Sequence, residues 1–256
     1  MDFAAVSDFV IWTQEGRVNT AALDLGSKVV VIDAMRKREH AAKWRTIAER
    51  HFNQSLSALV LTHHHSDHTT GVAVYRDVPI VSSSDTKHLM AKARKKYVTE
   101  TFKNDYSISG DTYTLRVVQT DGHTKGSSYG WVPERNLLIA GDTLFNKMFP
   151  YGIDPSVDPV LWQKALKEMV ALEPETIIPG HGPAATVEDL QEISEFFDQA
   201  LSFIQSKIGE GLTPQKIGED PDCPEYYSAG TQRRERVKIQ SFVKWAEIVR
   251  ERYKSP

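Results

Sequence analysis

The sequence predicts a mixed α/β domain in which short strands and amphipathic helices alternate along the chain. Short runs of aliphatic and β-branched residues recur between turn residues, and the longer stretches between them carry apolar residues at the spacing of a helix face. Several of the apolar runs end directly on a histidine or an aspartate. Loops at strand ends are where functional sites are commonly built, so this pattern predicts a site as well as a fold.

Length and composition bound the class of protein. The chain has 256 residues, of which 40% are hydrophobic and 25% are charged, so it can bury one large core. We therefore expect a single domain over residues 1–256, with C-terminal helices at about 187–256 packed on it. The formal net charge is -3, so no overall basic field favours binding of nucleic acid or of an anionic membrane.

The cysteine content and the N-terminus indicate a cellular setting. Cys223 is the only cysteine, which excludes an internal disulfide framework and a cysteine-rich metal site and fits a reducing compartment. Residues 1–8 lack a basic region before an apolar core, and no apolar run approaches membrane-spanning length. We expect a soluble, unprocessed, cytoplasmic protein.

The first part of the chain predicts strands, then a helix, then another strand. Phe9–Trp12, Thr20–Leu23 and Val29–Ile32 are apolar runs separated by turns, which is typical of a β-meander. Met35–Phe52 has the apolar spacing of a helix, and Ala58–Leu61 is a further strand. The chain leaves that strand directly into its most histidine-rich loop.

This loop, Thr62–Gly71, contains the pattern H-x-H-x-D-H. In extended backbone, residues two apart project to the same side, so His63, His65 and Asp67 can converge on one point, and a local bend lets His68 join them. Imidazole and carboxylate groups are the ligands that zinc or iron prefers. The loop therefore predicts a metal site.

The remaining elements follow the same alternation. Ser84 suits the N-cap of a helix that runs through about Tyr97. Further strands are predicted at 78–81, 113–118, 127–132 and 136–142 and in a short segment that ends at His181. Further helices are predicted at 159–172, 187–208 and 232–253, and the last two flank a loop around 221–230.

Three more metal-compatible residues lie at the ends of these runs. His123 lies on a turn between two strands, Asp142 ends the strand that begins at residue 136, and His181 ends another short strand. Gly141 has no side chain, so another part of the chain can approach closely beside Asp142.

Four segments that carry these residues, THHHSDH, DGHT, GDTLF and IPGHG, resemble the metallo-β-lactamase superfamily of hydrolases in order and spacing over almost the whole chain. The joint match is far more specific than any one segment. The resemblance implies a four-layer αββα sandwich, in which two mixed β-sheets pack face to face with helices outside. It also implies a dinuclear metal site at one edge of the sheets.

The resemblance implies a role for each ligand. His63, His65 and His123 would hold one metal ion, Asp67, His68 and His181 would hold the other, and Asp142 would bridge them. Asp33 matches the family's early acidic position and would orient a ligand. The family usually has Asp-Thr-Gly there, whereas this chain has Asp33-Ala34-Met35.

The expected reaction follows from these ligands. Two divalent ions, zinc by preference with iron or manganese also compatible, would lower the pKa of a shared water and supply a bridging hydroxide. Asp67 would orient this nucleophile and accept its proton. The expected substrate is an ester, thioester or lactone of a small molecule. Asp142 argues against antibiotic hydrolysis, because the superfamily's true β-lactamases generally lack a bridging aspartate, and Gly141–Phe145 looks like the glyoxalase II branch, which cleaves thioesters.

Other activities remain open at this point. Some members of the superfamily are nucleases or phosphodiesterases, although the acidic balance of this chain makes nucleic acid an unexpected partner. Sulfur dioxygenases of the same fold are another alternative. Gly126–Gly130 also fits G-x-S-x-G, the nucleophile elbow of serine hydrolases, with Ser128 as the nucleophile, but the following Pro133 and the turn at Asn136 do not suit the helix that an elbow requires.

The segment after Asp142 is the expected substrate wall. Lys147, Phe149 and Tyr151 combine aromatic surface with one cation, which suits an apolar substrate group beside a carboxylate. The glutathione-binding pattern of glyoxalase II does not align here, and Arg233 and Arg234 add charge near the C-terminus without a recognisable motif. The oligomeric state is left open.

Overall fold

The computed structural model describes residues 1–227 and 231–254. Residues 228–230, in the loop expected around 221–230, and residues 255–256, at the end of the expected C-terminal region, lie outside this described part. No helix among the described residues is long and apolar enough to cross a membrane.

Twelve strands form the sheet structure of the described chain. Hydrogen-bonded neighbours run in the order β7-β6-β5-β4-β3-β12-β11-β10-β9-β8, with β2 and β1 added beside β3. In chain order the strands are β1 (Ala4–Ser7), β2 (Val10–Glu15), β3 (Val18–Asp24), β4 (Val29–Ile32), β5 (Leu56–Val60), β6 (Ile80–Ser83), β7 (Glu100–Phe102), β8 (Asp105–Ser109), β9 (Thr114–Gln119), β10 (Ser128–Val132), β11 (Leu137–Phe145) and β12 (Thr176–His181).

The sheet consists of two halves that meet at a single residue pair, His181 on β12 and Val18 on β3. The first half comprises β1 to β7 and the second β8 to β12. Each half is mixed: β4, β5, β6 and β7 pair in parallel, as do β11 and β12, and the other pairs are antiparallel. The structure thus contains the two expected mixed sheets, joined at one edge.

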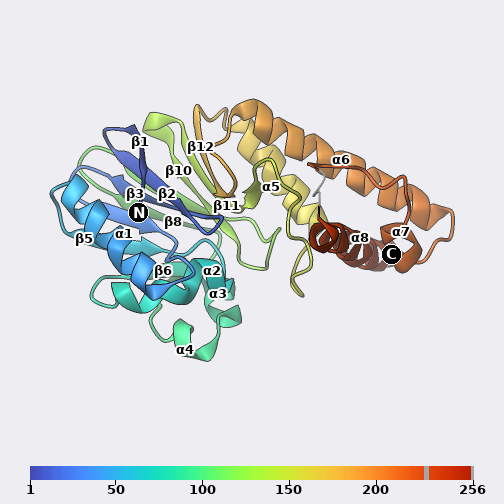
Figure 1. Ribbon diagram of the computed structural model, residues 1–256, viewed down its shortest axis with the longest axis horizontal. Helices are drawn as coiled ribbons and strands as arrows, with labels where there is room; N and C mark the ends of the chain where they lie inside the picture. Colours follow the sequence, from blue (N-terminus) through green and yellow to red (C-terminus); the bar gives the residue numbers. More distant parts are fainter. Residues whose placement is uncertain (228–230, 255–256) are drawn as a thin grey trace.

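Helices cover the outer faces of both halves (Figure 1). They are α1 (Arg38–His51), α2 (Ser66–Thr69), α3 (Ser84–Leu89), α4 (Lys92–Lys95), α5 (Pro159–Ala171), α6 (Val187–Gly209), α7 (Pro214–Gly218) and α8 (Gln232–Lys254), with short 3₁₀ segments η1 (Thr70–Tyr75) and η2 (Pro133–Arg135). Figure 1 shows α1 on the side of β5, and α5, α6 and α8 together at the other end.

Strand β4 shows why the layers form. All four of its residues are buried, because alternate side chains enter different cores. Val29 and Val31 pack against α1, where Trp44 is fully buried, while Val30 and Ile32 enter the core shared with the second half. A third core lies between β11 and α5, α6 and α8. The order helix, sheet, sheet, helix confirms the predicted four-layer fold.

Aromatic residues join the C-terminal helices to the second half of the sheet. The rings of Trp162 on α5, Phe197 on α6 and Trp245 on α8 lie with centroids 4.9 to 6.3 Å apart. Trp162 also donates its indole N–H to the carbonyl of Thr143 on β11, at 2.8 Å. These buried aromatics supply much of the apolar area that holds α8 beside the strand ends.

One predicted helix is wrong. The stretch from Ser84 to about Tyr97 is two short helices, α3 and α4, and the N-cap is Ser83, whose hydroxyl accepts the backbone N–H of Thr86. The break occurs because Met90 turns extended, with ψ 144°, and is buried in the core beneath α1. The strands β1, β7 and β8 were not predicted, because most of their residues are exposed or half-buried and few apolar side chains mark them.

Candidate metal centre and cavity

Four chain segments bring the predicted ligands together at one edge of the sheet structure. The loop after β5 carries His63, His65, Asp67 and His68, the last two on the short helix α2. The other three ligands come from the second half: His123 precedes β10, Asp142 lies within β11, and His181 ends β12. Their ligand atoms form two groups, each with all atoms within 4.8 Å of one another.

The first group contains His63, His65, His123 and Asp142. His65 Nδ1 lies 3.1 Å from His123 Nε2, and the Nε2 atoms of His63 and His123 each lie 3.5 Å from Asp142 Oδ2. Ligand atoms around a tetrahedral zinc ion with bonds of about 2.0–2.1 Å stand about 3.3 Å apart. The spacing therefore fits a tetrahedral metal ion.

The second group contains Asp67, His68 and His181. The Nε2 atoms of His68 and His181 lie 3.4 Å apart, and His181 Nε2 lies 3.7 Å from Asp67 Oδ2. Asp142 also reaches this group, because its Oδ1 lies 3.1 Å from His68 Nε2 and its Oδ2 lies 3.1 Å from His181 Nε2. One carboxylate thus faces both groups.

An unpaired buried atom tests whether a metal fits this site. His63 is fully buried, and among the described residues its Nε2 has no hydrogen-bond partner. An imidazole nitrogen without a partner in the interior costs free energy unless another group uses its lone pair. Because this atom points at Asp142 in the middle of the cluster, a metal ion satisfies it, and the residues present fit the expected ions.

Glycines make room for the shared carboxylate. A Cβ atom on Gly180 would lie 2.1 Å from Asp142 Oδ1, and one on Gly141 would lie 2.9 Å from Thr62 Cβ. Gly141 also has φ +52°, a conformation that favours glycine. These contacts confirm the close approach expected beside Asp142.

Asp33 connects the first strands to the cluster. It is buried, accepts the N–H and the hydroxyl of Thr62 at 2.8 and 2.7 Å, and lies 2.7 Å from His68 Nδ1. Holding Nδ1 orients the ring so that Nε2 faces Asp142, the ligand-orienting role that the sequence implied for Asp33. His181 is held in the same way by the carbonyl of Arg17, 2.6 Å from its Nδ1.

Asp154 is a site residue that the sequence analysis missed. Its Oδ2 lies 2.9 Å from His65 Nε2 and 3.3 Å from His64 Nε2, and its Oδ1 accepts the backbone N–H and the hydroxyl of Ser156. It lies in an irregular segment between β11 and α5, where no motif or period marks it. His64, the remaining histidine of the loop, faces this carboxylate.

Four histidines of the cluster fall into two pairs, one with lowered and one with raised pKa values. Burial holds the pKa of His63 well below its ordinary value and lowers that of His123 to about 3. Burial acts in the same direction on His68 and His181, but the charge of Asp142 overcomes it and raises the pKa of both. Burial alone would raise the pKa of Asp142, but the surrounding histidines, His181 first, hold it well below its ordinary value.

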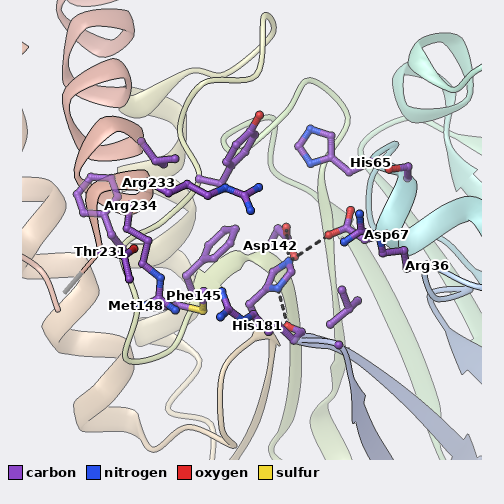
Figure 2. A pocket seen from close by; sticks show the side chains of 17 residues that line it. Arg36, His65, Asp67, Asp142, Phe145, Met148, His181, Thr231, Arg233 and Arg234 are labelled. Atoms are coloured by element: carbon purple, nitrogen blue, oxygen red, sulfur yellow. Dashed lines mark hydrogen bonds and ion pairs between the residues drawn. The ribbon is translucent and has the colours of Figure 1, made fainter. Parts of the chain in front are cut away.

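A cavity of about 870 Å³ opens onto the cluster. Asp67, Asp142 and His181 line its metal side, and Phe145, Met148, Phe149 and Val237 give it an apolar wall (Figure 2). Among the three predicted substrate residues, Phe149 and Tyr151 line the cavity. Lys147 is absent from the lining, and its ammonium instead lies 3.6 Å from the carboxylate of Asp189 on α6, so its placement does not support substrate contact.

The serine-hydrolase alternative is not supported by the geometry. Ser128 is the first residue of β10, is 1% exposed, and donates its hydroxyl to the carbonyl of Gly126. It therefore lies inside a strand rather than on a sharp turn into a helix, which a nucleophile elbow requires.

The fold and the site define the class of protein, an αββα sandwich with His and Asp groups able to bind metal at one sheet edge. Residues 13–181 match the family model of the Metallo-beta-lactamase superfamily, and the chain belongs to that superfamily. This confirms the resemblance found in the sequence.

Relatives and solved structures agree with this assignment. A hydroxyacylglutathione hydrolase of Bartonella henselae is 30% identical over 50% of this chain and 44% of its own length. A protein named thioesterase pkgB, from Emericella nidulans, is 28% identical over 65% of this chain and 46% of its own. The chain thus matches less than half the length of these relatives. A metallo-beta-lactamase from Pontibacter korlensis has the same fold, with a TM-score of 0.67 at 21% identity over 77% of this chain and 98% of that one.

Proposed function

We propose that this protein is a metal-dependent hydrolase with two divalent ions, zinc by preference, that cleaves an ester, thioester or lactone of a small molecule. The observation that carries the proposal is the position of Asp142, whose carboxylate faces both ligand groups on the wall of the cavity. A thioester is the preferred substrate class, because the relatives include a hydroxyacylglutathione hydrolase and a thioesterase.

The two ions would supply a nucleophilic water of lowered pKa and would polarise the scissile carbonyl. The protein's own contribution begins with the protonation state of its ligands. Because the pKa values of His63 and His123 are lowered, both rings are neutral near pH 7 and offer free lone pairs. The lowered pKa of Asp142 keeps its carboxylate ionised, so its negative charge lies beside both ligand groups.

Asp67 is the proposed proton acceptor. Its side chain is 29% exposed, lines the cavity, and is therefore the carboxylate of the cluster that can reach both substrate and water. The other carboxylate of the lining, Asp142, is 4% exposed and is surrounded by imidazoles. Asp67 can therefore orient an attacking water and take its proton while Asp142 stays ionised.

The apolar wall binds the part of the substrate that does not react. Phe145 stacks on His181 with ring centroids 4.9 Å apart, so an acyl chain against Phe145 and Met148 would leave its carbonyl at the ligand cluster. Such positioning lowers the entropic cost of reaction without any further chemical group.

The test combines metal content with a substrate panel. Protein purified from its native host is analysed for metal, stripped with a chelator, reloaded, and assayed on thioesters, lactones and phosphodiesters. We expect two ions per chain and hydrolysis of a thioester that is lost on stripping and regained on reloading. Asp142→Ala should lose metal and activity together.

The same panel separates the alternatives. Activity confined to phosphodiesters would favour a nuclease, and oxygen uptake with a persulfide by iron-loaded protein would favour a sulfur dioxygenase. Thioester cleavage that survives complete metal removal would contradict the proposal outright.

A further inference from the structure

Four arginines line the cavity that opens onto the metal centre: Arg17, Arg36, Arg233 and Arg234. In the part of the chain that the structure describes, the arginines that form ion pairs are Arg45, Arg135 and Arg252, and none of these lines the cavity. The cavity therefore contains guanidinium groups that no carboxylate of the described chain neutralises.

The carboxylates of the lining do not balance these charges. The acidic residues there are Asp67 and Asp142, and both belong to the ligand groups of the metal centre. Once divalent ions occupy that centre, the cavity carries excess positive charge although the whole chain has a formal net charge of -3. Like charges around one concave surface reinforce one another's field and attract anionic ligands.

The arginines lie on different sides of the ligand cluster. Figure 2 shows Arg233 and Arg234 on the side of α8 and Arg36 on the opposite side, with Asp142 and His181 between them. Arg36 follows β4 in the first half of the sheet, whereas α8 packs on the second half. A substrate whose scissile carbonyl sits at the metal centre therefore has cations facing both of its ends.

We propose that the substrate carries negative groups on both sides of the bond that is cleaved, so that Arg36 binds one end and Arg233 and Arg234 bind the other. This inference rests on the proposed hydrolase function. Arg233 and Arg234 are consecutive residues of α8 and both line the cavity, so this side offers two positive charges, which suits a dianionic phosphate, whereas the single Arg36 suits a carboxylate. The substrate class is thus an acidic acyl thioester of a phosphorylated thiol.

The test uses four thioesters that differ only in charge. Pentanoyl and glutaryl groups are each joined to pantetheine and to 4′-phosphopantetheine, so that a carboxylate and a phosphate are varied independently. We expect kcat/KM to rise about fivefold or more for each added negative group at low ionic strength and to fall back towards the neutral level in salt.

The arginines on each side of the ligand cluster are tested by a separate variant. The double variant Arg233→Gln and Arg234→Gln should remove the preference for the phosphate and keep the preference for the carboxylate. The single variant Arg36→Gln should remove the preference for the carboxylate and keep the preference for the phosphate. The matched control is Arg236→Gln, which lies on the same helix but lines a different cavity with Ile239 and Gln240. Metal content and melting temperature should be unchanged in all three variants.

Equal kcat/KM for the four thioesters would overturn this inference and leave the proposed hydrolase function standing. Binding is tested separately from hydrolysis by calorimetry with the corresponding thioethers, which cannot be hydrolysed. If no thioester is cleaved but the doubly charged thioether binds more tightly than the neutral one, and each variant loses its own part of that preference, the binding site stands and the proposed reaction does not.

Discussion

Asp154 Oδ2 lies 2.9 Å from Nε2 of His65, on the opposite ring nitrogen from the one that faces His123. A carboxylate at that position fixes the ring so that Nδ1 is the atom presented to a metal. Ser156 in turn holds Asp154 through its backbone N–H and its hydroxyl. The first metal group therefore depends on a segment that contributes no ligand to it.

Replacing Asp154 should weaken metal binding without removing a ligand. In Asp154→Ala we expect the metal affinity to fall about 10–100-fold, because His65 loses its orienting partner. Competition with a chromophoric chelator measures this affinity. Asp154→Asn keeps an oxygen for His65 and should recover part of the loss, whereas the exposed Asp222→Asn should have no effect. Unchanged affinity in Asp154→Ala would show that His65 is held by other contacts.

A single methyl group should displace the shared carboxylate. A Cβ on Gly180 would lie 2.1 Å from Asp142 Oδ1, so Gly180→Ala should move Asp142 and lower metal content and turnover together. Gly209→Ala is the control, since a Cβ there meets nothing within 4 Å and Ala suits the end of α6 better by about 0.5–1 kcal/mol. Elemental analysis of both variants decides: full metal content in Gly180→Ala would mean that the strand shifts to absorb the methyl group.

Acidification should release the ion at His68 and His181 first. Their pKa values are raised, so protons compete with the metal there at a higher pH than at His63 and His123, whose pKa values are lowered. We expect metal content to fall from two ions to one before it falls to none as the pH is lowered. Loss of both ions in one step would contradict this order.

The raised pKa values of His68 and His181 predict how the contribution of these two residues to the stability of the metal-free chain depends on pH. Charged His68 and His181 stabilise the fold below the unfolded pKa of about 6.5, and this contribution is lost as the pH rises through their folded pKa. The gain in melting temperature on adding metal should therefore grow with rising pH. Thermal unfolding with and without metal, at several pH values, measures this gain.

Phe149 should contribute more to stability than to binding. It is 8% exposed, and its ring stacks on Trp245 with centroids 6.2 Å apart, so most of its surface lies in the core formed with α8. We expect Phe149→Ala to lower the free energy of unfolding by about 3 kcal/mol, measured by urea denaturation. Because the same residue edges the cavity, KM should also rise, and an effect on KM alone would place the ring in the cavity rather than in the core.

Most of the ligand set was visible in the sequence because His63 follows β5, His123 lies on the turn before β10 and His181 ends β12, and strand ends meet at sheet edges; Asp142 was expected to end its strand but lies within β11, which continues to Phe145. The structure brings His63, His123 and Asp142 into one group together with His65. Asp154 was missed because it lies in an irregular segment between β11 and α5 and acts through His65. The cationic lining also could not be assigned from the sequence, since Arg36 and Arg233 are far apart along the chain and only the packing of α8 places both on one cavity.

The two halves of the sheet share one hydrogen-bonded residue pair, His181 with Val18. Each ligand group, with Asp142 counted in both, draws residues from both halves: His63, His65, Asp67 and His68 follow β5, while His123, Asp142 and His181 belong to the second half. A bound ion is therefore also a cross-link over the weakest seam of the sheet structure. Removing it should let the halves separate more readily, so that hydrogen exchange rises first along the edge between β3 and β12.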